Sequence, residues 1–233
     1  MLLAQLSDPH VSDDDPRAAA ALGRAVLAVL SLRPAPDAVL VTGDLAEHGS
    51  PTEYARVREL LAPLPMPVAT LAGNHDDPEA VDSAGELRVA GYRLVLCETA
   101  QPGRDDGRLD VERLAARLDD SPTVVAMHHP PLLIGVDALD AIGLPADDRD
   151  ALAQLLARSP QVRRVVAGHV HRSASGTLGG CGVVTCGSTY RQARLELETD
   201  ALELTPDEPA VFALHLDVRG ALTSHVVTVR PGA

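Results

Sequence analysis

Short, almost wholly apolar runs alternate with longer stretches whose apolar residues recur every three or four positions. In the first third of the chain the apolar runs are residues 2–8, 37–44 and 67–73, and the amphipathic stretches are 16–32 and 51–62. Buried parallel strands show near-continuous apolar runs, whereas amphipathic helices show a period of 3.6 residues. Pro16 and Pro51 each begin an amphipathic stretch, which is where proline is tolerated in a helix. The pattern predicts a βαβαβ order and a mostly parallel sheet covered by helices.

The rest of the chain continues this alternation and then changes. Residues 86–99 hold two β-rich runs about Gly91, which predict a hairpin. Further strands are predicted at 122–129 and 161–171, and helices at 110–120 and about 145–158. From Thr177 onward, runs typical of strands follow one another between turns, at 181–186, 193–198, 210–218 and 224–230. We therefore expect one α/β domain over residues 1–233, with two sheets between helical layers and the segment from about 177 to 233 completing a second, more antiparallel sheet.

Composition narrows the classes of function. The 233 residues carry a formal net charge of −13, which argues against a role in wrapping nucleic acid polymers. Neither a signal peptide nor a membrane-spanning run is visible, so the expectation is a soluble, cytoplasmic protein that does not engage a membrane. Its three cysteines (Cys97, Cys181, Cys186) form no C-x-x-C pair and suggest incidental thiols in a reducing compartment, although a disulfide between Cys181 and Cys186 is an alternative.

Polar exceptions to the apolar pattern fall at the carboxyl ends of the predicted strands. They are Asp8-Pro9-His10, Gly43-Asp44, Gly73-Asn74-His75-Asp76, His128-His129 and Gly168-His169-Val170-His171. In open α/β sheets, ligands bind outside the carboxyl ends of the strands. Each stretch alone has an ordinary explanation; Asn-His, for example, is good turn chemistry. Five of them at strand ends predict one shared site.

The residue types indicate a transition-metal site. Carboxylates, an amide and imidazoles without thiolates suit Zn, Mn, Fe or Co better than Ca or a structural Cys-zinc site. Seven or eight donors are too many for one tetrahedral ion, so two ions sharing a bridging carboxylate are expected. In an extended segment residues i and i+2 point the same way, which would let Asp8 and His10 hold one ion. By the same spacing, His169 and His171 could each face a different ion.

The order D-x-H, G-D-x-x-x-x-G, G-N-H-D, H-H-P and G-H-x-H resembles the calcineurin-like metallophosphoesterase superfamily. Over about residues 1–190 the stretches "GDLAEHGSPTEYARVRELL", "GNHDD", "PGRDDGRLD" and "MHHPP" are similar to bacterial class III 3′,5′-cyclic-nucleotide phosphodiesterases and related glycerophosphodiesterases. Two residues depart from the pattern. Pro9 stiffens the D-x-H turn, and Glu47 stands where the cyclic-nucleotide branch often has Asp, which leaves the exact substrate open.

The resemblance implies a four-layer αββα sandwich, two mixed sheets flanked by helices, and assigns roles to individual residues. The implied metal ligands are Asp8, His10 and His171 on the first ion, Asn74, His128 and His169 on the second, and Asp44 bridging both. His75 is the implied catalytic residue, pointing at the phosphate or leaving-group oxygen without binding metal. Asp76 would orient His75 or cap a following helix. Expected substrate contacts are Glu47, Asn74, His75 and His129.

The activity that follows is hydrolysis of a small phosphodiester, most simply a 3′,5′-cyclic nucleotide such as cAMP. Two ions would lower the pKa of a bridging water so that the hydroxide attacks the phosphate, while His75 assists the leaving group. Alternatives are a phosphomonoesterase or nucleotide-pyrophosphate hydrolase of the same superfamily, or a catalytically inactive scaffold. The identity of the metals (Fe, Mn, Zn or Co) stays open. The tail at about 193–230 could cover the site or form the edge of a homodimer.

Overall fold

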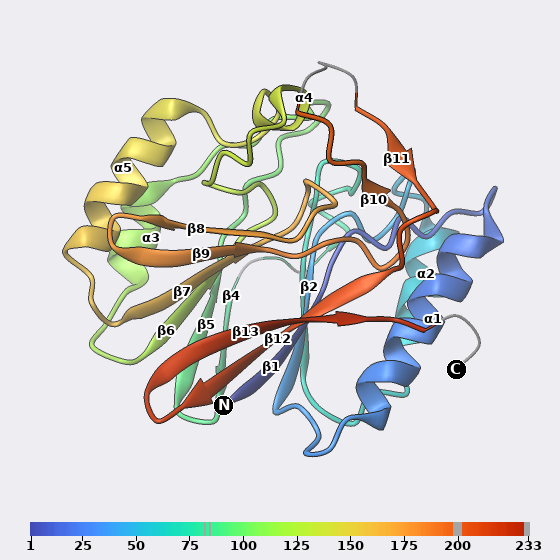
Figure 1. Ribbon diagram of the computed structural model, residues 1–233, viewed down its shortest axis with the longest axis horizontal. Coiled ribbons are helices and arrows are strands. Elements are labelled where there is room, and N and C mark those ends of the chain that lie inside the picture. The colour runs from blue at the N-terminus through green and yellow to red at the C-terminus, as the bar shows by residue number, and fades with distance from the viewer. Residues whose placement is uncertain (82, 84, 198–201, 231–233) are drawn as a thin grey trace.

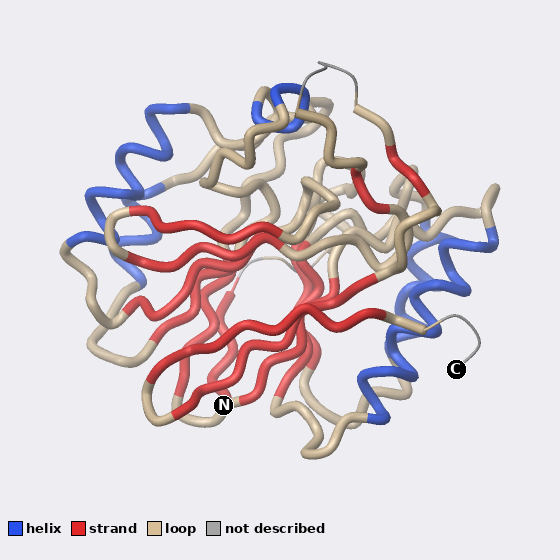
Figure 2. Tube along the Cα trace, in the orientation of Figure 1, coloured by secondary structure: helices blue, strands red, loops and turns tan. Residues whose placement is uncertain are grey.

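Two β-sheets face each other and helices cover their outer faces (Figures 1 and 2). The computed structural model describes residues 1–81, 83, 85–197 and 202–230. One apolar cluster lies between the two sheets. A second cluster lies between the first sheet and its helices, and a third lies between the second sheet and its helices. This is the predicted αββα sandwich.

The first sheet has the strand order β13-β12-β1-β2-β3. Its strands are β1 (Leu2–Leu6), β2 (Ala38–Thr42), β3 (Val68–Leu71), β12 (Val211–Val218) and β13 (Ala221–Thr228). β1, β2 and β3 are parallel, whereas β12 and β13 are joined by antiparallel pairing. The helices α1 (Pro16–Ser31) and α2 (Pro51–Leu61) connect the parallel strands and pack on this sheet.

The ends of these helices are encoded locally. Asp15 caps α1 by accepting a hydrogen bond from the backbone of Arg17. Ser50 and Glu53 form a reciprocal capping box at the start of α2, so two otherwise unsatisfied backbone donors are bonded.

The second sheet has the order β4-β5-β6-β7-β9-β8. Its strands are β4 (Gly85–Val89), β5 (Tyr92–Leu96), β6 (Thr123–Ala126), β7 (Val162–Ala167), β8 (Ala174–Leu178) and β9 (Cys181–Thr185). The helices α3 (Val111–Arg117) and α5 (Ala146–Ala157) pack on its outer face. A short helix, α4 (Asp137–Asp140), and a two-residue pair, β10 (Gln192–Ala193) with β11 (Leu204–Thr205), lie outside both sheets.

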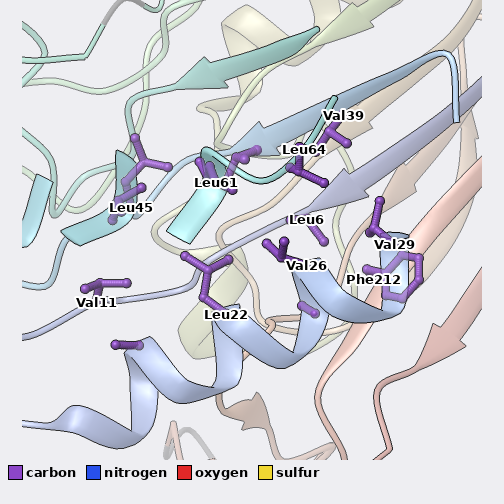
Figure 3. Packing of buried hydrophobic residues seen from close by; sticks show 14 of the residues in the cluster. Leu6, Val11, Leu22, Val26, Val29, Val39, Leu45, Leu61, Leu64 and Phe212 are labelled. Carbon is purple, nitrogen blue, oxygen red and sulfur yellow. The ribbon is translucent and has the colours of Figure 1, made fainter. Parts of the chain in front are cut away.

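Apolar faces hold the layers together. In Figure 3 the side chains of Leu22, Val26 and Val29 on α1 lie in one cluster with Leu6 and Phe212 of the first sheet. Each of these five side chains is at most 2% exposed, and full burial of such a side chain contributes about 1.5–3 kcal/mol. The predicted amphipathic face of the first helix is therefore the face that covers the sheet.

A polar network crosses the interior between the two sheets. The Gln5 side chain donates to the carbonyl of Ala167 in the second sheet (2.9 Å), and its Oε1 accepts from Nε2 of His215 (2.9 Å). His215 Nδ1 in turn lies 2.8 Å from the Ser224 hydroxyl. Gln5 and His215 have no exposed surface, so these bonds satisfy groups that water cannot reach.

The prediction that the whole C-terminal segment completes the second sheet was wrong. β9 joins the second sheet as expected, but β12 and β13 extend the first sheet, because Phe212 packs into the cluster under α1. Of the strand expected at 193–198, the described part forms only the end of β10, since Leu195 and Leu197 are exposed; residue 198 lies outside the described residues. All three cysteines are buried and free, so the alternative of a disulfide is excluded.

No helix within the described ranges is both long and apolar enough to cross a membrane.

Candidate metal centre

Five of the seven predicted metal ligands have a left-handed backbone. The φ angles of Asp8, His10, Asp44, His169 and His171 are +49°, +45°, +49°, +70° and +47°. Such conformations cost about 1–3 kcal/mol each and persist where the surroundings impose them, characteristically at functional sites. They also correct one part of the sequence argument. Asp8 and His10 do lie in one cluster, but through a sharp turn and not through an extended i, i+2 segment.

The first donor group lies where β1, β2 and β7 end. It consists of Asp8, His10, Asp44 and His171, with potential ligand atoms within 4.8 Å of one another. Nε2 of His10 is 2.9 Å from Nε2 of His171 and 3.3 Å from Oδ2 of Asp44. The other ring nitrogens face acceptors: His10 Nδ1 is 2.7 Å from the Glu47 carboxylate, and His171 Nδ1 is 2.8 Å from the Arg191 carbonyl.

The second donor group brings together residues that follow β3, β6 and β7. Oδ1 of Asn74 lies 3.0 Å from both His128 Nε2 and His169 Nδ1, and these two nitrogens are 3.2 Å apart. Here too the remaining ring nitrogens donate to carbonyls, His128 Nδ1 to Thr42 (2.7 Å) and His169 Nε2 to Ile142 (3.0 Å).

This arrangement fits two cations. A carbonyl can only accept, so the ring nitrogen facing it carries the proton, and the inward nitrogen presents a lone pair. The inward atoms of each group are therefore acceptors that meet other acceptors, which a metal ion between them would satisfy. Asp44 serves both groups, since its Oδ2 approaches His10 and its Oδ1 lies 3.5 Å from His128 Nε2. Asp44 is thus placed to bridge.

Electrostatics also favour positive charge at the first group. Burial alone would lower the pKa of His10, but hydrogen bonds to Asp44 and Glu47, and the nearby charge of Asp8, outweigh it and raise that pKa to about 10. Without a metal ion, the imidazole of His10 would hold a proton and so provide the positive charge. The two buried carboxylates, Asp8 and Asp44, create this demand for a cation.

His129 is close to the second group yet differs from its members. Its donor atoms come near those of His128 and His169, but its Nε2 faces the carbonyl of Asp105 (3.1 Å) and its Nδ1 faces the Thr99 hydroxyl (2.9 Å). Burial, aided by the neighbouring His128, lowers its pKa to about 3, so the ring is neutral. It is fully buried and absent from the cavity wall. The predicted substrate contact of His129 therefore has no counterpart in the structure, and the second group is completed by Asn74.

His75 lies beside the donor groups and lines the same cavity. Its backbone N–H donates to Asp44 Oδ1 (3.0 Å), and its Nδ1 donates to the backbone carbonyl of Glu47 (3.0 Å). The side chain is 37% exposed. Because Nδ1 is engaged, Nε2 is the nitrogen free to meet a ligand. His75 also falls in a cluster with His10 and Glu47, but the hydrogen bonds just described already use the atoms that face each other there.

Asp76 has a role that the sequence did not indicate. Its buried carboxylate accepts three backbone N–H bonds, from Gly73 (2.9 Å), Leu45 (3.0 Å) and Ala46 (3.0 Å). It neither orients His75 nor caps a helix, and so both expectations were wrong. Burial, with the nearby charge of Asp44, raises its pKa. Asp76 joins the loop after β2 to the loop after β3.

Gly73 is required by close packing. A Cβ at this position would lie 2.1 Å from Oδ1 of Asp44 and 2.7 Å from Cε1 of His128. Both distances are far below van der Waals contact, so only glycine lets the loop after β3 approach Asp44.

The cavity above the donor groups has a volume of about 620 Å³, which includes space open to solvent. Seven of the polar residues described above line it: His10, Asp44, Glu47, Asn74, His75, His169 and His171. The other lining residues were not named from the sequence: Leu139, Ile142, Tyr190, Arg191, Leu202 and Leu204. Leu202 and Leu204 belong to the tail at about 193–230, so they agree with the alternative in which this tail covers the site. Tyr190 and Arg191 belong to the polar stretch 187–192 after the strand at 181–186.

Comparisons with known proteins agree with this geometry. The family model described as calcineurin-like phosphoesterase matches residues 1–173. A probable cyclic nucleotide phosphodiesterase of a Synechococcus species is 37% identical over 232 residues, covering 88% of each chain. The 3′,5′-cyclic adenosine monophosphate phosphodiesterase CpdA of Pseudomonas aeruginosa is 37% identical over 192 residues, 74% of this chain and 70% of the relative.

More distant relatives extend the comparison. A probable glycerophosphodiester phosphodiesterase of Arcobacter nitrofigilis is 29% identical and covers 97% of this chain and 92% of the relative. Among solved structures, a dimetal phosphatase from Danio rerio has a TM-score of 0.69 at 15% identity and covers 99% of both chains, which supports the shared fold.

Proposed function

Since the chain belongs to the calcineurin-like phosphoesterase family, we propose that it is a two-metal phosphodiesterase whose substrate is a 3′,5′-cyclic nucleotide such as cAMP. The general class of activity, that of a metal-dependent phosphodiesterase, rests on the family and on the relatives named as phosphodiesterases. The number of ions and the cyclic nucleotide are the proposal.

The observation that carries the proposal is the placement of Asp44. Each of its carboxylate oxygens approaches one group of inward-facing donors, which supports a shared ligand between two ions. When bound, such ions supply an activated water and neutralise the charge of the phosphate. The chain's own contribution is to hold these donors rigidly: Glu47, Thr42 and the carbonyls of Ile142 and Arg191 orient the four imidazoles.

His75 is proposed to protonate the leaving group. An alkoxide leaving from a phosphodiester needs a proton, and Nε2 of His75 is available in the cavity next to Asp44 and Asn74. The Glu47 carbonyl fixes the ring by accepting from Nδ1. For proton donation the ring must therefore enter the reaction as the imidazolium, which gives the Nε2 proton to the leaving oxygen and keeps the proton on Nδ1. Glu47 would thus orient two histidines: its carbonyl orients His75, and its carboxylate orients His10.

A glycerophosphodiester is the second candidate substrate. The relative from Arcobacter nitrofigilis, named for this activity, covers nearly the whole chain, although at a lower identity than the cyclic nucleotide phosphodiesterases. The sequence relatives described above are named as phosphodiesterases and not as phosphomonoesterases or pyrophosphate hydrolases. An inactive scaffold is disfavoured because all seven predicted ligands are present and lie together.

A substrate panel with metal analysis tests the proposal. Purified protein would be analysed for bound metals, loaded with Mn²⁺ and offered 3′,5′-cAMP, 2′,3′-cAMP, glycerophosphoethanolamine, bis(p-nitrophenyl) phosphate and p-nitrophenyl phosphate. We expect about two ions per chain and the highest kcat/KM on 3′,5′-cAMP. Preference for the glycerophosphodiester would select the second candidate. Turnover of the monoester alone, or one ion per chain, would contradict the proposal.

A further inference from the structure

Arg191 is the one permanently cationic side chain among the described residues that line the cavity. It is held on one side: Nη2 donates to the Asp15 carboxylate (3.2 Å) and to the Tyr190 hydroxyl (3.0 Å), and the guanidinium lies 4.8 Å from the centre of the Tyr190 ring. Its backbone carbonyl accepts from His171, so Arg191 is anchored directly beside the first donor group. The guanidinium has five N–H donors, of which these bonds use only those on Nη2.

An apolar wall stands in the same cavity. Leu202 and Leu204 are 45% and 38% exposed although both are large and hydrophobic. Together with Leu139 and Ile142 they line the cavity above the polar floor. Pockets for small molecules combine such apolar surface with a few fixed polar groups that set orientation. The wall and Arg191 together suit a flat, largely apolar group with acceptor atoms on its edge.

We propose that Arg191, Leu202 and Leu204 form a base subsite, in which a purine lies against the leucines and the guanidinium donates to acceptors on the purine edge. This inference rests on the proposed function, because it requires a nucleotide substrate. Guanine presents two adjacent acceptors, N7 and O6, whereas adenine places the N6 donor beside N7. Arginine has donors only, so Arg191 strengthens binding of a guanine nucleotide more than binding of an adenine nucleotide.

The test compares Arg191→Ala with Arg17→Ala. Arg17 pairs with the same Asp15 carboxylate but is absent from the cavity wall. Arg17→Ala therefore controls for the loss of one arginine that pairs with Asp15. The Mn²⁺-loaded proteins would be assayed on cGMP, cAMP and methyl p-nitrophenyl phosphate, a diester without a base. Arg191→Ala should raise KM for cGMP at least about fivefold and KM for cAMP less, with kcat within about twofold. On the methyl ester, which has no base, Arg191→Ala should lose less activity than it loses on cGMP. Arg17→Ala should change every reaction by less than about twofold.

Binding of products separates the inference from the proposed function. The Kd of 5′-GMP and 5′-AMP, measured by calorimetry on the Mn²⁺-loaded proteins, needs no turnover. If the wild type hydrolyses no diester but Arg191→Ala weakens 5′-GMP binding at least about fivefold, the base subsite stands and the phosphodiesterase proposal fails. If Arg191→Ala changes KM for cGMP and Kd for 5′-GMP by less than twofold, the subsite is refuted. An equal loss on all substrates with reduced metal content would show that Arg191 only supports His171, which also refutes it.

Discussion

At the scale of single residues, the site stores conformational strain in its own backbone. Asp8, His10, Asp44, His169 and His171 all adopt left-handed φ values, although none is glycine. The neighbouring glycines, such as Gly73, let other segments come close enough to hold these turns in place. The inward donors are therefore positioned before any ion arrives, and the energy for this comes from the surrounding sandwich.

His75→Ala should separate catalysis from metal binding. Because His75 contacts Asp44 only through its backbone N–H, the variant should keep its metal content. Loss of a proton donor should lower kcat on cAMP by about 10²–10⁴. The loss should be much smaller on bis(p-nitrophenyl) phosphate, whose nitrophenolate leaves without a proton.

His225→Ala is the matched control, since His225 is an exposed histidine on β13. Its metal content and kinetics should equal those of the wild type. Metal loss in His75→Ala would mean that His75 is a ligand, contrary to the proposed role. Equal rate losses on both substrates would argue against proton donation.

The residues of the two donor groups were predictable from the sequence, whereas most of the other residues that line the cavity were not. Asp8, Asn74 and His169 belong to short polar stretches that interrupt apolar runs, so their types and order were visible in the sequence. Arg191 lies in a polar stretch that contains no metal-ligand residue type, and Leu204 lies in the tail; both reach the cavity because the chain returns over the site after β9. Which side chains end up facing a cavity depends on this tertiary path.

At the scale of elements, two loops act as one unit through a single carboxylate. Asp76 binds the backbone of Leu45 and Ala46 after β2 and of Gly73 after β3. These loops carry Asp44, whose carboxylate approaches both donor groups, and Asn74 of the second group. The spacing between the two donor groups therefore depends on a residue that lies outside both.

Asp76→Ala should loosen the metal centre. It leaves three backbone donors without their acceptor, and each buried unsatisfied group costs about 1–3 kcal/mol. We expect the free energy of unfolding to fall by at least about 2 kcal/mol in urea titrations, with reduced metal content.

Asp77→Ala serves as the control, because Asp77 is exposed and its carboxylate accepts one backbone bond among the described residues, from Glu79. It should cost less than about 1 kcal/mol and leave the metal content unchanged. If Asp76→Ala kept full metal content, the coupling of the two loops through Asp76 would be wrong.

Elements with strong patterns were predicted and weakly patterned ones were missed. The apolar runs that became β1, β2 and β6 and the amphipathic stretch of α1 needed no tertiary information. β8, with the sequence Ala-Ser-Gly-Thr-Leu, has little apolar signal and forms because β9 offers its edge. The strand at 210–218 was predicted, but it was placed in the wrong sheet, because the apolar pattern of a strand does not specify the strand with which it pairs.

At the scale of the whole molecule, the layer between the two sheets opposes protonation of His215. His215 is buried between Gln5 and Ser224, and burial, with the charge of Arg164, lowers its pKa to about 3. In the unfolded chain a histidine titrates near pH 6.5. The unfolded state thus binds the extra proton between about pH 6.5 and 3. Stability contributed by neutral His215 is complete above pH 6.5 and falls by up to about 1.4 kcal/mol per pH unit below it.

His215→Gln should remove this part of the pH dependence. Urea unfolding at pH 7.5 and 5.5 would be compared for the wild type, His215→Gln and the exposed control His225→Gln. The stability difference between the two pH values should shrink by about 1 kcal/mol in His215→Gln alone. An unchanged difference would mean that His215 does not stay neutral in the folded protein.

Removal of metal should destabilise the fold as a whole. A ligand present at a hundredfold excess over its Kd contributes about 2.7 kcal/mol, which corresponds to roughly 5–10 °C in Tm for a chain of this size. Calorimetry with and without EDTA would measure the shift. Asp44→Asn, which lacks the shared negative charge, should show a smaller shift. Equal shifts in the two proteins would contradict the bridging role of Asp44.

The pairing of β1 with β12 has a consequence for biosynthesis. β1 carries the chain to Asp8 and His10, and it lies between β2 and β12 in the finished sheet. β1 precedes β12 by about two hundred residues in the chain, so during synthesis one edge of β1 has no partner strand until β12 has been made. The segment that holds Asp8 and His10 is thus completed only when β12 pairs with β1, and a chain cut short before β12 would expose that edge to other nascent chains.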